Sequence, residues 1–215
     1  MRLALLEDRL EEGARLSLPS APRVLYVVSG RVVVEGDGSR VFLADDHAWH
    51  GTSAVVVHTE RTARLWRWEL RREDGATEAH DPALRTTVKL SHAIDLPSGG
   101  ALMRADRVDF PPRGIAYTHT HQGPGIRVLL EGRFRVDTNG HTMVVAPGEA
   151  WFERGPDPVY AESTADEPTS FVRVMVLPVA LLGKSSIRYV KPEDQARPKS
   201  QRYTVLVDAP LEEAG

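Results

Sequence analysis

Two histidines, His119 and His121, are the residues of this chain best suited to chemistry. One threonine separates them, and on a β-strand this spacing places both imidazoles on the same face, about 6 to 7 Å apart along the strand. Neutral imidazole is a common ligand of divalent transition metals. The pair could therefore bind one ion from neighbouring corners of its coordination shell. The alternative is a pair of surface or hydrogen-bonded histidines.

The composition narrows the kinds of site that are possible. The 215 residues include no cysteine, which excludes disulfides and thiolate metal sites, so a transition metal would need His, Asp or Glu ligands. The 27 Lys and Arg residues against 30 Asp and Glu residues give a net charge of −3, without a basic block of the kind that binds nucleic acid or a membrane. No stretch approaches 18 uncharged apolar residues. We expect a soluble cytoplasmic protein with no nucleic-acid or membrane partner.

The elements that must position the histidines are β-strands. Short runs rich in Val, Leu and aromatic residues recur along the chain, separated by Gly, Pro, Asp and Asn, which is typical of strands. The expected strands are 24–28, 31–35, 54–58, 63–70, 102–109, 126–130, 133–137, 159–163 and 170–177. Asn139-Gly140 predicts a tight hairpin, and the segment Glu35-Gly36-Asp37-Gly38 predicts another. We expect residues 191–201 to form a loop and 203–207 an edge strand.

An internal repeat indicates a duplicated all-β fold. Residues 25–34 align with 127–136 at an offset of 102, and the same offset places Ala48-Trp49 on Ala150-Trp151. A further gap of four residues aligns 65–70 with 171–176. Chance similarity between Val-rich strands would not reproduce these landmarks at a common offset. Each copy is long enough to close a small sandwich or barrel.

The second copy resembles the cupin superfamily. Gly114, His119, His121 and Gly132 stand as in the first cupin motif, with one residue fewer between the glycine and the first histidine, and the Pro-Gly turn at Gly148 resembles the second motif. The resemblance implies a bicupin, which is a duplicated double-stranded β-helix, or jelly roll, with a metal ion inside the barrel.

The repeat and the resemblance together predict three parts. Residues 1–83 should form an N-terminal cupin-like barrel without a metal motif, and residues 84–177 a C-terminal cupin barrel with the His-x-His pair. Residues 178–215 should form a C-terminal extension that packs along a sheet edge. The offset of 102 places Ser17 and Pro19 where the second copy has its histidines.

Half of the ligand set that the resemblance implies is missing. Gly125 stands where the cupin motif has a glutamate, and Val159 stands near the place of its last histidine. Arg127, two residues beyond Gly125, has the strand parity of the missing carboxylate. A guanidinium cannot bind a cation, so Arg127 beside the histidines suggests carboxylate recognition. The alternative places Arg127 on the outside of the barrel.

Other side chains could complete the site. Glu153 follows Trp151 by two residues, so both should share a face, and Glu153 is the first candidate for a third metal ligand. Glu149 shares this parity but lies beside the Pro-Gly turn, near the rim of the barrel. Tyr117 shares the parity of the histidines and could either donate a hydrogen bond to a ligand or pack in the barrel. The expected site comprises His119, His121 and Glu153 as metal ligands and Arg127, Tyr117 and Trp151 as ligand-binding residues.

These features leave two classes of function open. In the first, a divalent ion of iron, manganese, nickel or zinc in the second barrel supports an oxygenase, isomerase or lyase that acts on a small anionic organic substrate. In the second, the barrel binds or senses a small molecule without turnover. The sequence favours the first class, and it assigns no catalytic residue. We also expect a homodimer, because exposed sheet edges invite pairing.

Overall fold

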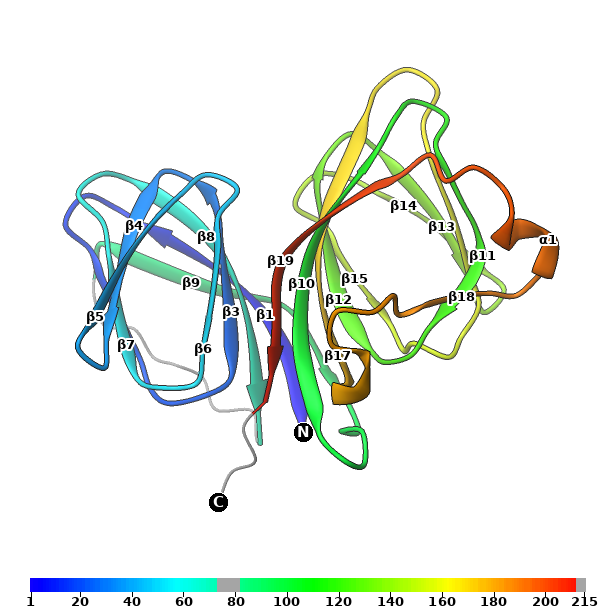
Figure 1. Ribbon diagram of the computed structural model, residues 1–215. Coiled ribbons are helices and arrows are strands. Elements are labelled where there is room, and N and C mark those ends of the chain that lie inside the picture. Colours follow the sequence, from blue (N-terminus) through cyan, green and yellow to red (C-terminus); the bar gives the residue numbers. More distant parts are fainter. Residues whose placement is uncertain (73–81, 212–215) are drawn as a thin grey trace. The chain divides into compact units, whose positions relative to one another are not determined.

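The computed structural model folds into two all-β units, Met1–Asp95 and Leu96–Gly215, which confirms the predicted duplicated all-β fold (Figure 1). The structure describes residues 1–72 and 82–211, and the last four residues of the predicted extension lie outside these ranges. Within the described ranges, no helix has the length and apolar character needed to cross a membrane.

The first unit is built from two antiparallel sheets. Its strands are β1 (Arg2–Leu10), β2 (Arg15–Leu18), β3 (Arg23–Ser29), β4 (Arg31–Gly36), β5 (Ser39–Ala44), β6 (Ala48–Gly51), β7 (Val55–His58), β8 (Ala63–Arg71) and β9 (Leu84–Ala93). One sheet has the strand order β6-β3-β8-β1-β9 and the other the order β2-β7-β4-β5. Leu25 and Leu65 from the first sheet pack with Leu16 and Val57 from the second, and these contacts form the core.

The second unit repeats this plan and adds a C-terminal segment. Its elements are β10 (Ala101–Phe110), β11 (Ile115–His121), β12 (Gly125–Glu131), β13 (Phe134–Thr138), β14 (His141–Val145), β15 (Ala150–Glu153), β16 (Val159–Ser163), β17 (Thr169–Pro178), the 3-10 turn η1 (Val179–Leu181), β18 (Ile187–Tyr189), the single helical turn α1 (Pro192–Gln195) and β19 (Arg202–Pro210). The sheet orders are β15-β12-β17-β10-β19 and β14-β13-β16-β11-β18. The first of these two sheets has the same strand order as the larger sheet of the first unit. In it, β15, β12, β17, β10 and β19 take the places of β6, β3, β8, β1 and β9.

Turns that only certain residues can adopt explain the landmarks of the repeat. Gly30 and Gly132 have φ angles of +93° and +78°, a region that disfavours residues with a Cβ atom. A Cβ atom would lie 2.6 Å from the Thr62 carbonyl oxygen at Gly30 and 2.5 Å from the Pro168 carbonyl oxygen at Gly132. The two glycines therefore allow the same tight turn in each copy.

The predicted hairpins are present. Asn139 and Gly140 both have positive φ angles, 51° and 74°, and Thr138 pairs with His141 on either side of them, as a two-residue type I′ turn requires. Asp37 and Gly38 form the equivalent turn between β4 and β5, with φ angles of 47° and 70°.

Long-range pairing corrects one of the predicted domain boundaries. Residues 84–93 form β9, which pairs along β1, so the division between the units follows Asp95 rather than residue 83. The predicted loop at 191–201 contains the helical turn α1, which starts at Pro192. The predicted edge strand at 203–207 is present as β19 at the end of its sheet, beside β10.

The strand registers also change which residue of the first unit corresponds to His119. His119 is paired with Val159 at the start of β16, and Leu18 is paired with Val55 at the start of β7. Leu18, rather than Ser17, therefore corresponds to His119. The difference of one residue arises because the pairing of β11 with β16 is irregular between Ala116 and His119. A buried leucine in the first unit takes the place of a buried histidine in the second.

Candidate functional site

The two histidines on β11 lie inside the second barrel. Only 6% of His119 and 4% of His121 is exposed. Their ring centroids are 4.9 Å apart, and the rings are nearly perpendicular, at 85°. The spacing of two residues on a strand accounts for this shared face.

Hydrogen bonding and burial determine the tautomer and the protonation state of the two imidazoles. His119 Nδ1 lies 2.7 Å from the Tyr117 carbonyl oxygen, which can only accept, so Nδ1 carries the proton and Nε2 has a free lone pair. Burial lowers the pKa of His119, although Glu153 opposes this shift. Burial, followed by the charges of Arg173 and Arg127, lowers the pKa of His121 well below its usual value. Both rings are therefore neutral at neutral pH.

Arg127 on β12 points into the same interior, where 1% of the residue is exposed. Its Nη1 donates to the Gly125 carbonyl oxygen at 2.6 Å. Its Nη2 lies 2.6 Å from Glu153 Oε2, but the two groups are not aligned as a hydrogen bond, and among the described residues neither atom has a hydrogen-bond partner. Burial lowers the pKa of Arg127 to about 10, which leaves the group cationic at neutral pH.

A second ion pair lies beside the first. Arg173 on β17 is the cross-strand neighbour of Arg127, and its Nε and Nη2 atoms lie 3.0 and 2.9 Å from Asp106 Oδ2 on β10. The two guanidinium groups are thus balanced by two carboxylates. The repeat and motif reasoning missed Asp106 and Arg173. Their position on paired strands next to Arg127 emerges only from the register.

Glu153 on β15 is positioned by Trp151. The Trp151 Nε1–H donates to Glu153 Oε1 at 2.9 Å, and Glu153 Oε2 lies 3.5 Å from His121 Nε2. The Trp151 ring packs in the apolar core, with its centroid 5.3 Å from that of Phe171. Trp151 was predicted as a ligand-binding residue. The structure instead places its ring in the core and its N–H on the carboxylate.

Tyr117 contacts the C-terminal segment. Its ring lies under the Arg197 guanidinium, 4.7 Å from the ring centroid, and its backbone carbonyl rather than its phenol is the group in contact with His119. The register is irregular between Ala116 and His119, so the strand parity from which Tyr117 was predicted to face the ligand does not hold.

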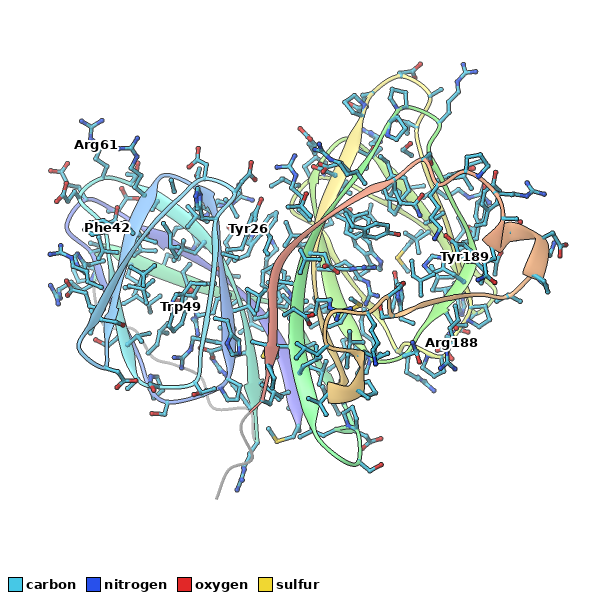
Figure 2. All side chains as sticks on the ribbon, in the orientation of Figure 1. Tyr26, Phe42, Trp49, Arg61, Arg188 and Tyr189 are labelled. Atoms are coloured by element: carbon cyan, nitrogen blue, oxygen red, sulfur yellow. The ribbon has the colours of Figure 1, made fainter. Side chains whose placement is uncertain are left out.

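A cleft of about 410 Å³ opens beside the charged interior. It is lined by Arg104, Asp106, Arg173, Gly183, Lys184, Ser185, Ser186, Ile187, Tyr189, Lys199, Tyr203, Val205 and Asp208. Asp106 and Arg173 line the cleft, and Arg173 is the cross-strand neighbour of Arg127, so the cleft adjoins the buried cluster. Tyr189 on β18 has its ring centroid 6.3 Å from that of His119, and Figure 2 shows Tyr189 and its neighbour Arg188 on opposite sides of the strand. The sequence predicted only that this extension packs along a sheet edge.

The residues do not fit a divalent ion in this arrangement. Two imidazoles and a carboxylate are suitable donors, but Arg127 lies against the Glu153 oxygen that faces His121. Within residues 1–72 and 82–211, no group of three His, Cys, Asp or Glu side chains is arranged to hold a metal ion. Arg127 also explains Gly125: a Cβ atom there would lie 2.6 Å from the Val174 carbonyl oxygen and 3.0 Å from Arg127 Nη1. The guanidinium thus fills the space beside the position where the cupin motif has its glutamate.

The comparisons with known proteins identify the family. A family model described as "Cupin domain" matches residues 106–176, which span β11 to β16 and the histidine pair. Residues 106–176 of this chain therefore form a cupin domain. No curated protein sequence matches the chain.

Several solved structures share the fold. AerE from Microcystis aeruginosa is 9% identical, with a TM-score of 0.63 over 81% of this chain and 88% of that chain. The DEL162-163 mutant of oxalate decarboxylase OxdC from Bacillus subtilis is 14% identical, with a TM-score of 0.64 over 91% of this chain and 73% of that chain. Another structure of this decarboxylase, described as having Mn(II) centres, is 12% identical, with a TM-score of 0.67 over the same shares. At these identities the likeness establishes the fold alone.

Proposed function

We propose that the second barrel of this cupin binds a small carboxylate-bearing molecule. The observation that carries the proposal is the buried Arg127, whose Nη2 faces Glu153 without the alignment of a hydrogen bond. A buried guanidinium that has one nitrogen without an aligned acceptor is costly. A ligand carboxylate can supply two coplanar acceptors and bind it in a bidentate manner.

In the proposed complex, the ligand replaces Glu153 as the partner of Arg127. The incoming carboxylate pairs with Arg127, and Glu153 keeps its hydrogen bond from Trp151. The neutral His119 ring already donates its Nδ1–H to the Tyr117 carbonyl oxygen, so of the two histidines only His121 has an N–H that can donate to the ligand. The neighbouring Arg173 raises the local positive potential, although Asp106 offsets it. The site thus favours anions over neutral molecules of the same shape.

Binding of organic acids to an Arg127→Met variant tests the proposal. We expect acids, but not their neutral amides, to raise the melting temperature of the wild type. The substitution should weaken carboxylate binding by about 2 to 4 kcal/mol, or roughly 30- to 1000-fold. Arg135→Met is the matched control, because Arg135 lies on β13 with 48% of its side chain exposed. Stabilisation by neutral compounds alone would refute the proposal.

Loss of folding must be separated from loss of binding. Arg127→Met leaves Glu153 buried without its cation, so the double variant Arg127→Met/Glu153→Gln removes both charges together. If the double variant melts cooperatively and still binds acids as the wild type does, Arg127 is not the anchor.

A metal-dependent enzyme of the oxygenase, isomerase or lyase type is the second candidate. It is favoured by the free Nε2 lone pair of His119 and by the short distance between the two histidine rings. It requires Arg127 to release Glu153. Metal analysis of the wild type beside a His119→Ala/His121→Ala variant tests it with iron, manganese, nickel and zinc. Equal metal content in the two proteins would exclude this candidate.

A further inference from the structure

The cleft built by the C-terminal segment provides a second set of contacts for the ligand. The Asp106–Arg173 pair lines the cleft and adjoins the Arg127 cluster. The opposite wall of the cleft comes from the segment between β17 and β19, including Ser186, Tyr189 and Lys199. A molecule anchored on Arg127 by one end would extend into this space. The following inference therefore rests on the proposed function.

Two arginines in the cleft are already neutralised. Arg173 pairs with Asp106. Arg104 binds Asp208 through two contacts of 3.0 Å and donates to the carbonyl oxygens of Leu181 and Lys184 at 2.6 Å each. These bonds hold the turn after η1 in place. Arg104 is thus committed to structure and is not available to a ligand.

The two lysines of the cleft are not neutralised. Lys184 Nζ donates to the Ala180 carbonyl oxygen at 3.0 Å, and Lys199 Nζ lies 5.4 Å from the centroid of the Tyr189 ring. Among residues 1–72 and 82–211, neither lysine forms an ion pair with a carboxylate. The lining therefore carries two positive charges beyond its balanced pairs, which attract a second anionic group.

Apolar and aromatic side chains lie between the two cationic ends. Ile187, Tyr189, Tyr203 and Val205 line this part of the cleft. The Tyr189 ring lies between the buried cluster and Lys199, because its centroid is near the His119 ring and Lys199 Nζ lies over it. The Tyr203 ring faces the Arg173 guanidinium at 5.3 Å. Flat ring faces favour a planar body by stacking.

We infer that the ligand is a dianion whose two acidic groups are joined by a planar, apolar body. One group pairs with Arg127, the body lies along Tyr189 and Tyr203, and the other group meets Lys199 at the mouth. The cleft of about 410 Å³ falls in the range of small-molecule sites, about 300 to 1000 Å³. Lys199 is the residue that distinguishes a dianion from a monoanion.

Calorimetric titration with benzoate and benzene-1,3-dicarboxylate tests the inference. We expect the wild type to bind the dicarboxylate at least about tenfold more tightly than benzoate, an advantage that decreases with added salt. Lys199→Gln should remove about tenfold of the dicarboxylate affinity and leave benzoate affinity unchanged. Lys191→Gln is the matched control, because Lys191 is exposed in the same segment but does not line the cleft.

The outcomes separate this inference from the proposal it rests on. If Arg127→Met weakens both acids but the wild type binds them equally, the carboxylate site stands and the dianion inference falls. The inference also falls if Lys199→Gln weakens both acids equally. If neither acid binds, or if Arg127→Met changes neither affinity, the proposed function itself falls.

Discussion

At the scale of single residues, the two barrels differ in how completely their buried arginines are hydrogen-bonded to carboxylates. Arg67 in the first unit is the cross-strand neighbour of Leu25 and donates to Asp8 at 2.7 and 3.0 Å and to Glu69 at 2.6 Å. Arg173 holds the equivalent position in the second unit, but its neighbour is Arg127, which lacks an aligned carboxylate. A complete network stabilises the fold, whereas an incomplete one leaves donors for a ligand.

Stability should depend on pH through His50 on β6. Its Nε2 is buried with no partner among the described residues, and burial lowers its pKa. Below the unfolded value of about 6.5, the unfolded chain therefore binds a proton that the folded chain does not. The free energy of unfolding should fall as the pH decreases through this value, by at most about 1.4 kcal/mol per pH unit for this one group.

Urea unfolding at pH 7.5 and pH 5.5 measures this effect. His50→Asn should lose less stability than the wild type between the two pH values, since it lacks the titrating group. The exposed His141 on β14 provides the control variant His141→Asn. An identical decrease in the wild type and His50→Asn would contradict the assignment.

At the scale of elements, the C-terminal segment completes the second unit. Its strand β19 extends one sheet beside β10, and its strand β18 extends the other beside β11. Between them, Arg197 lies over Tyr117 and pairs with Asp194 at 3.1 Å. The segment thus forms part of both sheets, and it also supplies one wall of the ligand cleft.

Asp208 holds this wall in position. It accepts from Arg104 and from the Gly183 backbone N–H, the latter at 2.7 Å. Asp208→Asn keeps the shape but removes the charge, and we expect a loss of about 1 to 3 kcal/mol in the free energy of unfolding.

Hydrogen exchange locates this effect. Peptides from residues 179–190 should exchange faster in Asp208→Asn than in the wild type. Glu193→Gln, on the exposed face of α1, should leave the exchange of 179–190 unchanged. Unaltered exchange in Asp208→Asn would show that Asp208 does not hold the wall.

At the scale of the whole molecule, each unit leaves a sheet edge with an exposed apolar side chain. The smaller sheet of the first unit ends on β5, where Phe42 is 70% exposed, and one sheet of the second unit ends on β14, where Val144 is 60% exposed. Such edges favour pairing with another chain. We therefore propose a homodimer formed through one of these edges.

Light scattering tests this proposal. The wild type should have about twice the chain mass of 23.8 kDa. A lysine at the pairing edge should give the monomer mass, so Phe42→Lys and Val144→Lys identify which edge is used. A monomeric wild type would refute the homodimer.

Local chemistry determined what the sequence alone could predict. Alternating apolar residues specified most strands, Asn139-Gly140 specified a hairpin, and the glycines at 30 and 132 marked the repeat. The His-x-His pair on one strand predicted a shared face for His119 and His121, because side chains alternate along any strand.

Only the tertiary structure decided how these parts meet. The pairing of β9 with β1, the place of Arg173 beside Arg127, and the contact of Arg127 with Glu153 all depend on strand registers between residues far apart in the chain. One irregular register breaks the strand parity between Tyr117 and His119 and aligns Leu18 with His119. Registers follow from the packing of a whole sheet, so no short segment of the sequence contains them.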